Sequence, residues 1–157
     1  MLVDASLVWI HLLSAAFWVG GMGCMQFAVR PAAVEALEPA PRLRLMSAVL
    51  GRFLAGVAVA IGLILASGAL LVARAGGLGA VHWSVHAMLA TGLAMMAIYG
   101  HLRFAAYPRL RRAMAAGELA AAGAALPGIR RLVNLNLVLG VAVFALAIVG
   151  PALGPAA

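Results

Sequence analysis

The chain has 157 residues, of which 66% are hydrophobic and 10% are charged. Soluble domains average about 45–50% apolar and about 25% charged residues, so a soluble protein of this size could not bury so much apolar surface. The net charge of +7 comes from arginines that lie between apolar runs, which favours anionic lipid headgroups and disfavours nucleic acid as the partner. The single cysteine, Cys24, rules out an intrachain disulfide.

Four apolar runs are long enough to cross a bilayer, which takes about 20 residues of helix. In chain order they are Leu7–Phe27, Phe53–Ala73, Val81–His101 and Leu132–Val149. A tail rich in glycine and proline follows the fourth run. The sequence therefore predicts an all-α fold in which residues 1–157 form one domain, a polytopic bundle of four transmembrane helices.

The segments between the runs are helical in character but contain helix breakers. Pro31, Pro39 and Pro41 interrupt the first of them. Residues 118–131 predict a short surface helix that Pro127 and Gly128 end. Neither segment is large enough for a catalytic domain, so both are expected to lie against the lipid headgroups.

The arginines predict how the chain is oriented. Most of them lie between the first and second runs or between the third and fourth: Arg30, Arg42, Arg44, Arg52, Arg103, Arg109, Arg111, Arg112, Arg130 and Arg131. Only Arg74 lies between the second and third. Under the positive-inside rule both basic segments face the cytoplasm and both termini face outward, which predicts a multi-pass protein of a bacterial inner membrane. Asp4 stands where a signal peptide would be basic, so the first helix is expected to be retained.

Polar groups inside a membrane helix are costly and usually face the bundle interior. On the first helix one stripe lies within roughly 60° of the His11 direction and holds His11, Ser14, Trp18, Met22 and Met25. Cys24 falls on the opposite side. No acidic residue lies within a run, which disfavours a hydrolase or a proton relay built on carboxylates.

The third helix predicts a second interior stripe of histidines separated by small residues. Its members lie within about 60° of the His86 direction: His82, His86, Ala90, Leu93, Ala97, Gly100 and His101. Because the first and third helices run in the same direction, His11 and His86 are expected at similar depth near the termini. His101 lies about 22 Å deeper than His86.

Two sites follow from this placement. The first is a metal site of His11 and His86, joined by His82 and by the thioethers of Met22 and Met25, since imidazole binds copper, zinc and haem iron and thioethers favour Cu(I). The second is a polar site of His101, Arg131 and Asn134. Asn134 and Asn136 point about 200° apart, so at most one faces inward. In the alternative reading His82 lies at the interface and the methionines only fill the core.

The order of several segments resembles the CopD-like family of small membrane proteins, named after copper resistance protein D. The likeness is carried by "HLLSAAFWVGGMGCMQFAVRPA", "RLRLMSAVLGRF", "VHAMLATGLAMMAIYGHLRF" and "GIRRLVNLNLVLG", and it spans nearly the whole chain. The resemblance implies copper handling at the inner membrane.

A more distant resemblance is to the HemJ-type protoporphyrinogen oxidases, four-helix membrane proteins linked to haem b. His11, His86, His101 and Asn134 fill places comparable to polar residues of that family. Met88 stands where that family has lysine and Leu135 where it has glutamate. Both departures remove ionisable groups, which argues against the oxidase activity but leaves a haem site open.

Three functions stay open from the sequence. The first is copper ion binding or transport without catalysis, and the residues suggest no catalytic group. The second is a b-type haem protein in membrane redox chemistry, with His11 and His86, or His86 and His101, as axial ligands. The third is a structural or assembly subunit. A homodimer that brings His11 of one copy beside His86 of another, and a periplasmic donor of metal or electrons, also stay open.

Overall fold

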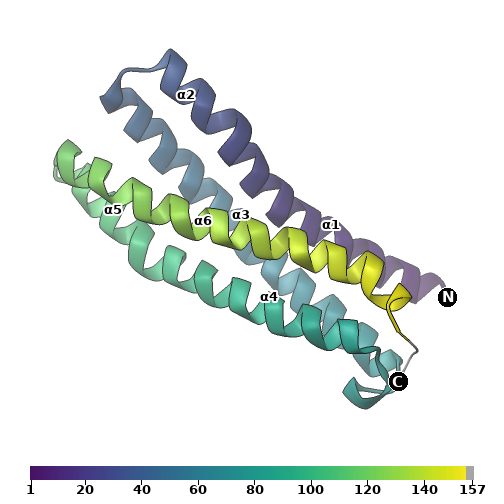
Figure 1. Cartoon of the computed structure of the whole chain (residues 1–157). Coiled ribbons are helices and arrows are strands. Elements are labelled where there is room, and N and C mark those ends of the chain that lie inside the picture. The colour runs from purple at the N-terminus through teal and green to yellow at the C-terminus, as the bar shows by residue number, and fades with distance from the viewer. Residues whose placement is uncertain (155–157) are drawn as a thin grey trace.

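The computed structural model describes residues 1–154, and these residues form helices and turns without a strand. The chain forms four long helices. They lie side by side, and the first helix begins at the end of the bundle where the last one ends (Figure 1). The first long helix consists of α1 (Leu2–Cys24), the π-helical turn η1 (Met25–Val29) and α2 (Arg30–Ala36). The second is α3 (Pro39–Arg74).

A short 3₁₀ turn, η2 (Leu78–Ala80), leads to the second half of the chain. The third long helix consists of α4 (Trp83–His101), the π-helical turn η3 (Leu102–Ala106) and α5 (Tyr107–Ala115). The fourth is α6 (Leu119–Val149), which ends in a 3₁₀ turn, η4 (Gly150–Ala152). The all-α, four-helix architecture predicted from the sequence is confirmed.

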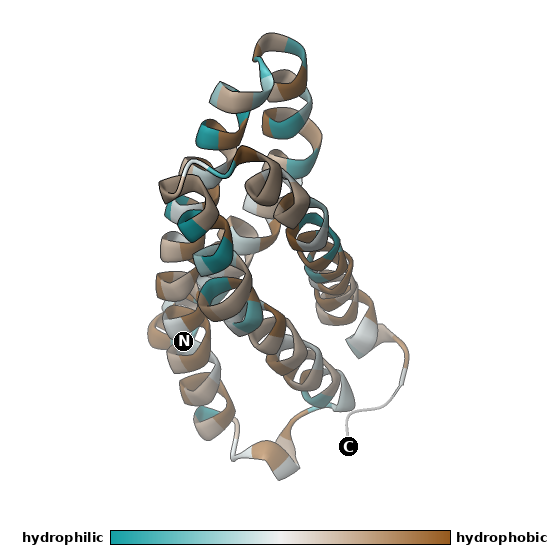
Figure 2. Ribbon diagram, turned by 90° about the vertical axis from the view of Figure 1, so that its left-hand side faces the viewer, coloured by the Kyte–Doolittle hydropathy of each residue, from teal (hydrophilic) through white to brown (hydrophobic). Residues whose placement is uncertain are grey.

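All four long helices are long and apolar enough to cross a membrane. They contain 33 to 36 residues each. At about 1.5 Å per residue such a helix is about 50 Å long, which exceeds the roughly 30 Å hydrocarbon core of a bilayer. The helices therefore continue past the apolar runs, mainly toward the α2–α3 and α5–α6 turns. We call this the basic end, since every arginine except Arg74 lies toward it, and hydrophilic residues gather there in Figure 2.

At the opposite end of the bundle, where α1 begins, the one arginine is paired with a carboxylate. Arg74 pairs with Asp4 through two contacts, one of them from Nη2 to Oδ2 at 3.2 Å and the other from Nε to Oδ1. The N-terminal ammonium lies 3.0 Å from the same carboxylate. This end therefore has no unpaired arginine among residues 1–154, which sharpens the charge difference between the two ends.

Two prolines expected to end helices do not end them. Pro31 lies in the first turn of α2 because the π-helical turn Met25–Val29 widens the helix just before it and makes room for the ring. Pro127 lies inside α6, so the predicted short surface helix ending there is wrong. Ala122 and Ile129, on either side of Pro127, are both buried in the core, so α6 continues through the proline with its inner face packed, despite a cost of roughly 3 kcal/mol for an interior proline.

The two halves of the chain are built as the same helical hairpin. In both, a five-residue π-helical turn is followed by one residue and then by proline, Pro31 in the first and Pro108 in the second. Buried residues in the first long helix of each half are separated by as many residues as Pro31 and Pro108 are. Trp18 corresponds in this way to Met95, and Met22 to Tyr99. Both hairpins start from the terminal end, so they form a parallel repeat related by an axis along the membrane normal.

At the centre of the bundle Tyr99 of α4 contacts both α1 and α3. The Tyr99 ring of α4 meets the Trp18 ring of α1 edge-on, with centroids 6.2 Å apart. The Tyr99 hydroxyl donates a hydrogen bond of 2.9 Å to the Leu54 carbonyl of α3. Since all three residues are buried, this contact fixes the first hairpin against α4.

Gly140 lets α6 approach α1 and α4 closely. A Cβ at this position would lie 2.6 Å from Val19 Cγ2 and 3.3 Å from Met95 Cε. We expect Gly140→Leu to lower the free energy of unfolding by about 1–3 kcal/mol, because the core has no space for the side chain. Thermal unfolding in mild detergent measures this. Gly128→Leu on the same helix, where a Cβ meets nothing within 4 Å, is the control and should not destabilise the protein.

Candidate functional site

The predicted stripe of α1 faces the bundle interior. Ser14, Trp18 and Met22 are buried, and Met22 is only 2% exposed. His11 and Met25, at the two ends of the stripe, are half-buried. Cys24 is exposed on the opposite face, as the helical spacing predicts. The periodicity argument for this helix is confirmed, while the metal-binding role of these side chains stays a prediction.

His11 is held by Ser67 on α3. Its Nδ1 lies 3.0 Å from the Ser67 hydroxyl oxygen, and that hydroxyl donates its own proton to the Leu63 carbonyl at 2.6 Å. The hydroxyl therefore accepts from Nδ1–H, and the neutral ring carries its lone pair on Nε2. Among residues 1–154 Ser67 is the side-chain partner of Nδ1 and the Ile64 backbone of the same helix also bonds the ring, while no side chain hydrogen-bonds Nε2. An imidazole that donates one N–H to a fixed partner and leaves the other nitrogen free is oriented as metal-ligating histidines are.

Gly68 supplies the space that the His11 ring occupies. A Cβ on Gly68 would lie 3.2 Å from His11 Cε1, closer than side chains normally pack. The ring therefore lies in the α1–α3 interface, flanked by Ser67 and Gly68. Sequence reasoning missed Ser67 as a partner of His11, although a serine in an apolar helix was a signal that one polar contact faces inward.

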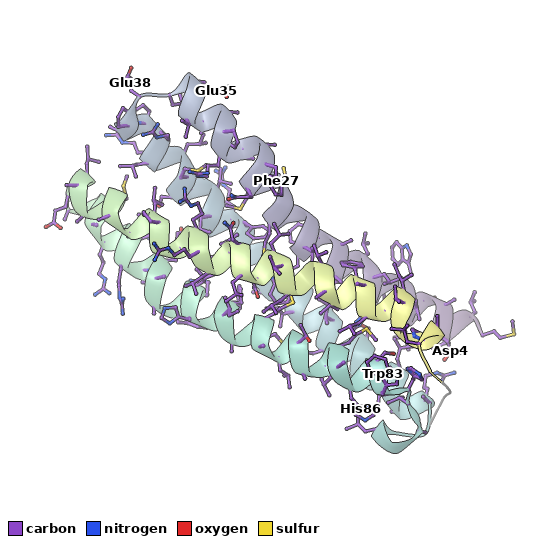
Figure 3. All side chains as sticks on the ribbon, in the orientation of Figure 1. Asp4, Phe27, Glu35, Glu38, Trp83 and His86 are labelled. Carbon is purple, nitrogen blue, oxygen red and sulfur yellow. The ribbon has the colours of Figure 1, made fainter. Side chains whose placement is uncertain are left out.

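The predicted histidine stripe of α4 faces outward, which corrects the expectation that it lines the interior. His86, Ala90, Leu93, Ala97 and His101 are all exposed. Figure 3 shows His86 pointing away from the other helices. The buried residues of α4 are Ser84, Met95 and Tyr99, because α4 packs on α6 and α1 through its larger side chains. Within one chain the structure therefore does not bring His11 and His86 together.

His82 has a local structural role. Its Nδ1 accepts a hydrogen bond of 3.3 Å from the Ser84 backbone N–H and so caps the start of α4. Its other ring nitrogen, Nε2, then carries the proton and donates to the Gly154 carbonyl at 3.4 Å. Both ring nitrogens are engaged, which agrees with the alternative reading of His82 rather than with a metal ligand.

The second predicted polar site is formed in part. His101 and Arg131 line one cavity of about 450 Å³ at the basic end. Arg109 of α5, which the sequence argument did not include, lines the same cavity, whereas Asn134 does not. The cavity therefore combines one histidine with two arginines, all of them exposed at the surface.

Asn136 is the fully buried asparagine of the core, while Asn134 is half-buried and its Oδ1 is also buried without a partner among residues 1–154. Asn136 is 1% exposed, and its Nδ2 donates a hydrogen bond of 3.3 Å to the Met95 carbonyl of α4. Its Oδ1 is buried with no partner among residues 1–154. The sequence argument placed Met22 on an interior stripe and left Asn136 open as the alternative to Asn134, but it did not place Met95 and Tyr99 on the inner face of α4.

Within residues 1–154 no three His, Cys, Asp or Glu side chains lie close enough together to hold a metal ion. The groups of the interior that suit a soft metal include one imidazole, His11, and the thioethers of Met22, Met25 and Met95. His11 lies between α1 and α3 within the first hairpin, and the methionines lie on α1, η1 and α4.

Comparison with protein families finds one match, over residues 47–149, to the family described as copper resistance protein D. The match covers more than half of the chain.

The chain belongs to the copper resistance protein D family.

Comparison with curated proteins and with solved structures finds no match. Membership of the copper resistance protein D family confirms the first resemblance noted in the sequence. Together with the four apolar helices, it indicates a multi-pass membrane protein with a copper-related function. The matched region begins within α3, so it includes Ser67 and Asn136 but not the α1 stripe that starts at His11.

Proposed function

We propose that this protein binds copper(I) and passes it along the inner face of α1. The observation that carries the proposal is the free Nε2 of His11, held in place by Ser67, at the head of a stripe that continues to two methionines. Imidazole and thioether groups together suit Cu(I), and neither group needs to lose a proton to bind it when the imidazole is neutral. Copper is the cargo in this proposal.

The methionines extend along the helix axis from His11 toward the basic end. Met22 lies about 16 Å along α1 from His11 and Met25 about 4 Å further, at about 1.5 Å per residue. Met25 and Met46 line a cavity of about 400 Å³ that opens at the basic end. Met95, across the centre on α4, is 4% exposed and faces the same core. A soft ion leaving His11 would thus meet thioethers at the middle and at the far end of the bundle.

The closely packed centre implies that passage needs the two hairpins to move. Trp18, Met22 and Tyr99 are buried there, and both cavities lie at the basic end. The parallel repeat supports such a motion, since repeat halves of transporters rock against each other around a site at their interface. The proposed copper path runs from the α1–α3 contact at His11 to the interface of the two hairpins at Met22 and Met95.

The orientation proposed for the chain follows from its charges. Both termini face the periplasm of a bacterial inner membrane, and the α2–α3 and α5–α6 turns face the cytoplasm. His11 then lies toward the periplasm, where a copper donor would meet it. Reporter fusions at residue 38 and at residue 154 check this, with cytoplasmic activity expected only for the first.

A haem b site within one chain fits these residues poorly. His86 and His101 lie about 22 Å apart along one helix and cannot ligate the same iron. His11 faces α3 while His86 faces outward. The exposed imidazoles of α4 leave one alternative, a haem held between two copies.

The test is metal analysis and the visible spectrum of the protein, purified in mild detergent from cells supplied with copper and haem precursor. We expect bound copper without a Soret band, and copper affinity at least about tenfold lower in His11→Ala, which corresponds to about 1.4 kcal/mol of binding free energy. His101→Ala, an imidazole outside the stripe, is the matched control and should bind copper normally. A Soret band that disappears in His86→Ala would show that the protein binds haem and would overturn the copper proposal. A protein that binds neither copper nor haem would point to a structural role.

A further inference from the structure

Three arginines from three different helices line the cavity of about 400 Å³ at the basic end. They are Arg30 of α2, Arg42 of α3 and Arg130 of α6. Every charged side chain lining this cavity is an arginine. We call it the arginine pocket. Three positive charges directed at one space repel one another, so the pocket favours an anion that neutralises them.

These arginines have no protein partner among residues 1–154. Arg30 and Arg42 are half-buried, yet none of the three arginines forms a salt bridge or a side-chain hydrogen bond with the described part of the chain. The carboxylates of this end, Glu35, Glu38 and Glu118, are exposed and pair with none of them. A guanidinium has five N–H donors in a planar fork that matches phosphate, so the pocket offers unused donors of that geometry.

Apart from Gln26, the remaining walls of the arginine pocket are apolar. They include Leu50, Ile129 and Val133, which are buried, and Leu126, which is half-buried. Arg130 and Pro127 are exposed, so the pocket reaches the surface of the bundle. A small free anion would use only the arginines. A ligand that fits the whole pocket has an anionic head and a hydrocarbon chain.

The pocket also lies at the level of lipid headgroups. Its lining residues, from Met25 to Val34 and from Arg42 to Leu50, flank the apolar runs of the first and second long helices at the basic end. The π-helical turn Met25–Val29 forms one wall and places Met25 and Gln26 beside the arginines. π-Helical turns often occur at functional sites.

We propose that the arginine pocket binds one anionic phospholipid, with its phosphate on Arg30, Arg42 and Arg130 and an acyl chain against Leu50 and Val133. The lipid would bridge the first hairpin to α6 at the end where residues 1–154 form no buried polar contact between them. Basic pockets between transmembrane helices bind anionic headgroups in this way.

The test uses the full chain in mild non-ionic detergent and measures binding of dioleoyl phosphatidylglycerol and dioleoyl phosphatidylcholine by native mass spectrometry. We expect the anionic lipid alone to bind tightly, and its affinity to fall about tenfold or more in the double variant Arg30→Gln, Arg42→Gln. Arg44→Gln, Arg52→Gln is the matched control, because both arginines are exposed on α3, line neither cavity and carry the same total charge. The control should bind as the unchanged protein does.

Three results would overturn the proposal. An equal loss of phosphatidylglycerol affinity in the control double variant would show that general surface charge, and not the pocket, is responsible for binding. Equal binding of phosphatidylcholine would show that the pocket does not recognise the anionic headgroup. Displacement of phosphatidylglycerol by inorganic phosphate alone would make the pocket a free-anion site. If the glutamine variant does not fold, Arg30→Lys, Arg42→Lys keeps the charge but removes the planar fork, and unchanged affinity in that variant would count against phosphate recognition by these arginines.

Discussion

Replacing Met22 and Met25 together with leucine should lower copper(I) passage at least about tenfold, since the loss of about 1.4 kcal/mol of transfer free energy is a factor of ten. Met22 is buried at the centre of the bundle and Met25 opens onto the arginine pocket, so together they cover the path from the middle to the basic end. Leucine keeps the volume and apolar character but removes the sulfur. Uptake of copper(I) into proteoliposomes measures the change.

The matched control for this prediction is Met114→Leu. Met114 of α5 is half-buried and packs against the core, but it lies outside the α1 stripe and lines neither cavity. Leucine for methionine usually costs less than about 1.5 kcal/mol of stability, so all the variants should remain folded. Equal uptake by the double variant and the unchanged protein would show that these methionines only fill space.

Helical spacing predicted the interior face of α1 because polar and bulky groups coincide there. His11, Ser14 and Trp18 share a direction, and a membrane helix turns such groups away from lipid. Cys24 and the exposed Phe27 lie outside that stripe. The sequence therefore contained enough to identify this half of the candidate site, although not its partner Ser67 on another helix.

The same argument failed on α4, and the reason is physical. Lipid and protein core are both apolar, so hydrophobicity does not distinguish the inner face of a membrane helix, and packing of shapes decides. On α4 the large side chains Met95 and Tyr99 fit against Gly140 and Trp18, which turns His86 outward. Close contacts of this kind depend on residues far apart in the sequence.

The helix ends were harder to predict than the spans. Proline normally ends a helix, but Pro31 and Pro108 are each preceded by a π-helical turn that accommodates the ring. The repeated pattern of phenylalanine four residues before proline, Phe27 and Phe104, marks both turns in the sequence. These phenylalanines are 76% and 77% exposed, so the two hairpins also present the same surface at equivalent places.

Trp18→Ala should be the most destabilising single substitution, with an expected loss of about 3–5 kcal/mol in the free energy of unfolding. Trp18 is 4% exposed, and its ring meets the Tyr99 ring edge-on at a centroid distance of 6.2 Å. Removing the indole leaves a cavity at the crossing of α1, α3 and α4. It also frees Tyr99, whose hydroxyl bond to the Leu54 carbonyl joins α4 to α3.

The chain offers a control of the same residue type on the same helix. Trp9 is 64% exposed, so Trp9→Ala removes the same side chain without opening a cavity, and its effect should stay within about 0.5 kcal/mol. Unfolding of both variants in one detergent, followed by circular dichroism, makes the comparison direct. Equal losses would mean that the centre is not held by Trp18. A large loss for Trp18 alone, partly restored in Trp18→Phe, would identify the Trp18–Tyr99 contact as what holds the first hairpin against α4. It would then be the contact that the proposed copper passage would have to loosen.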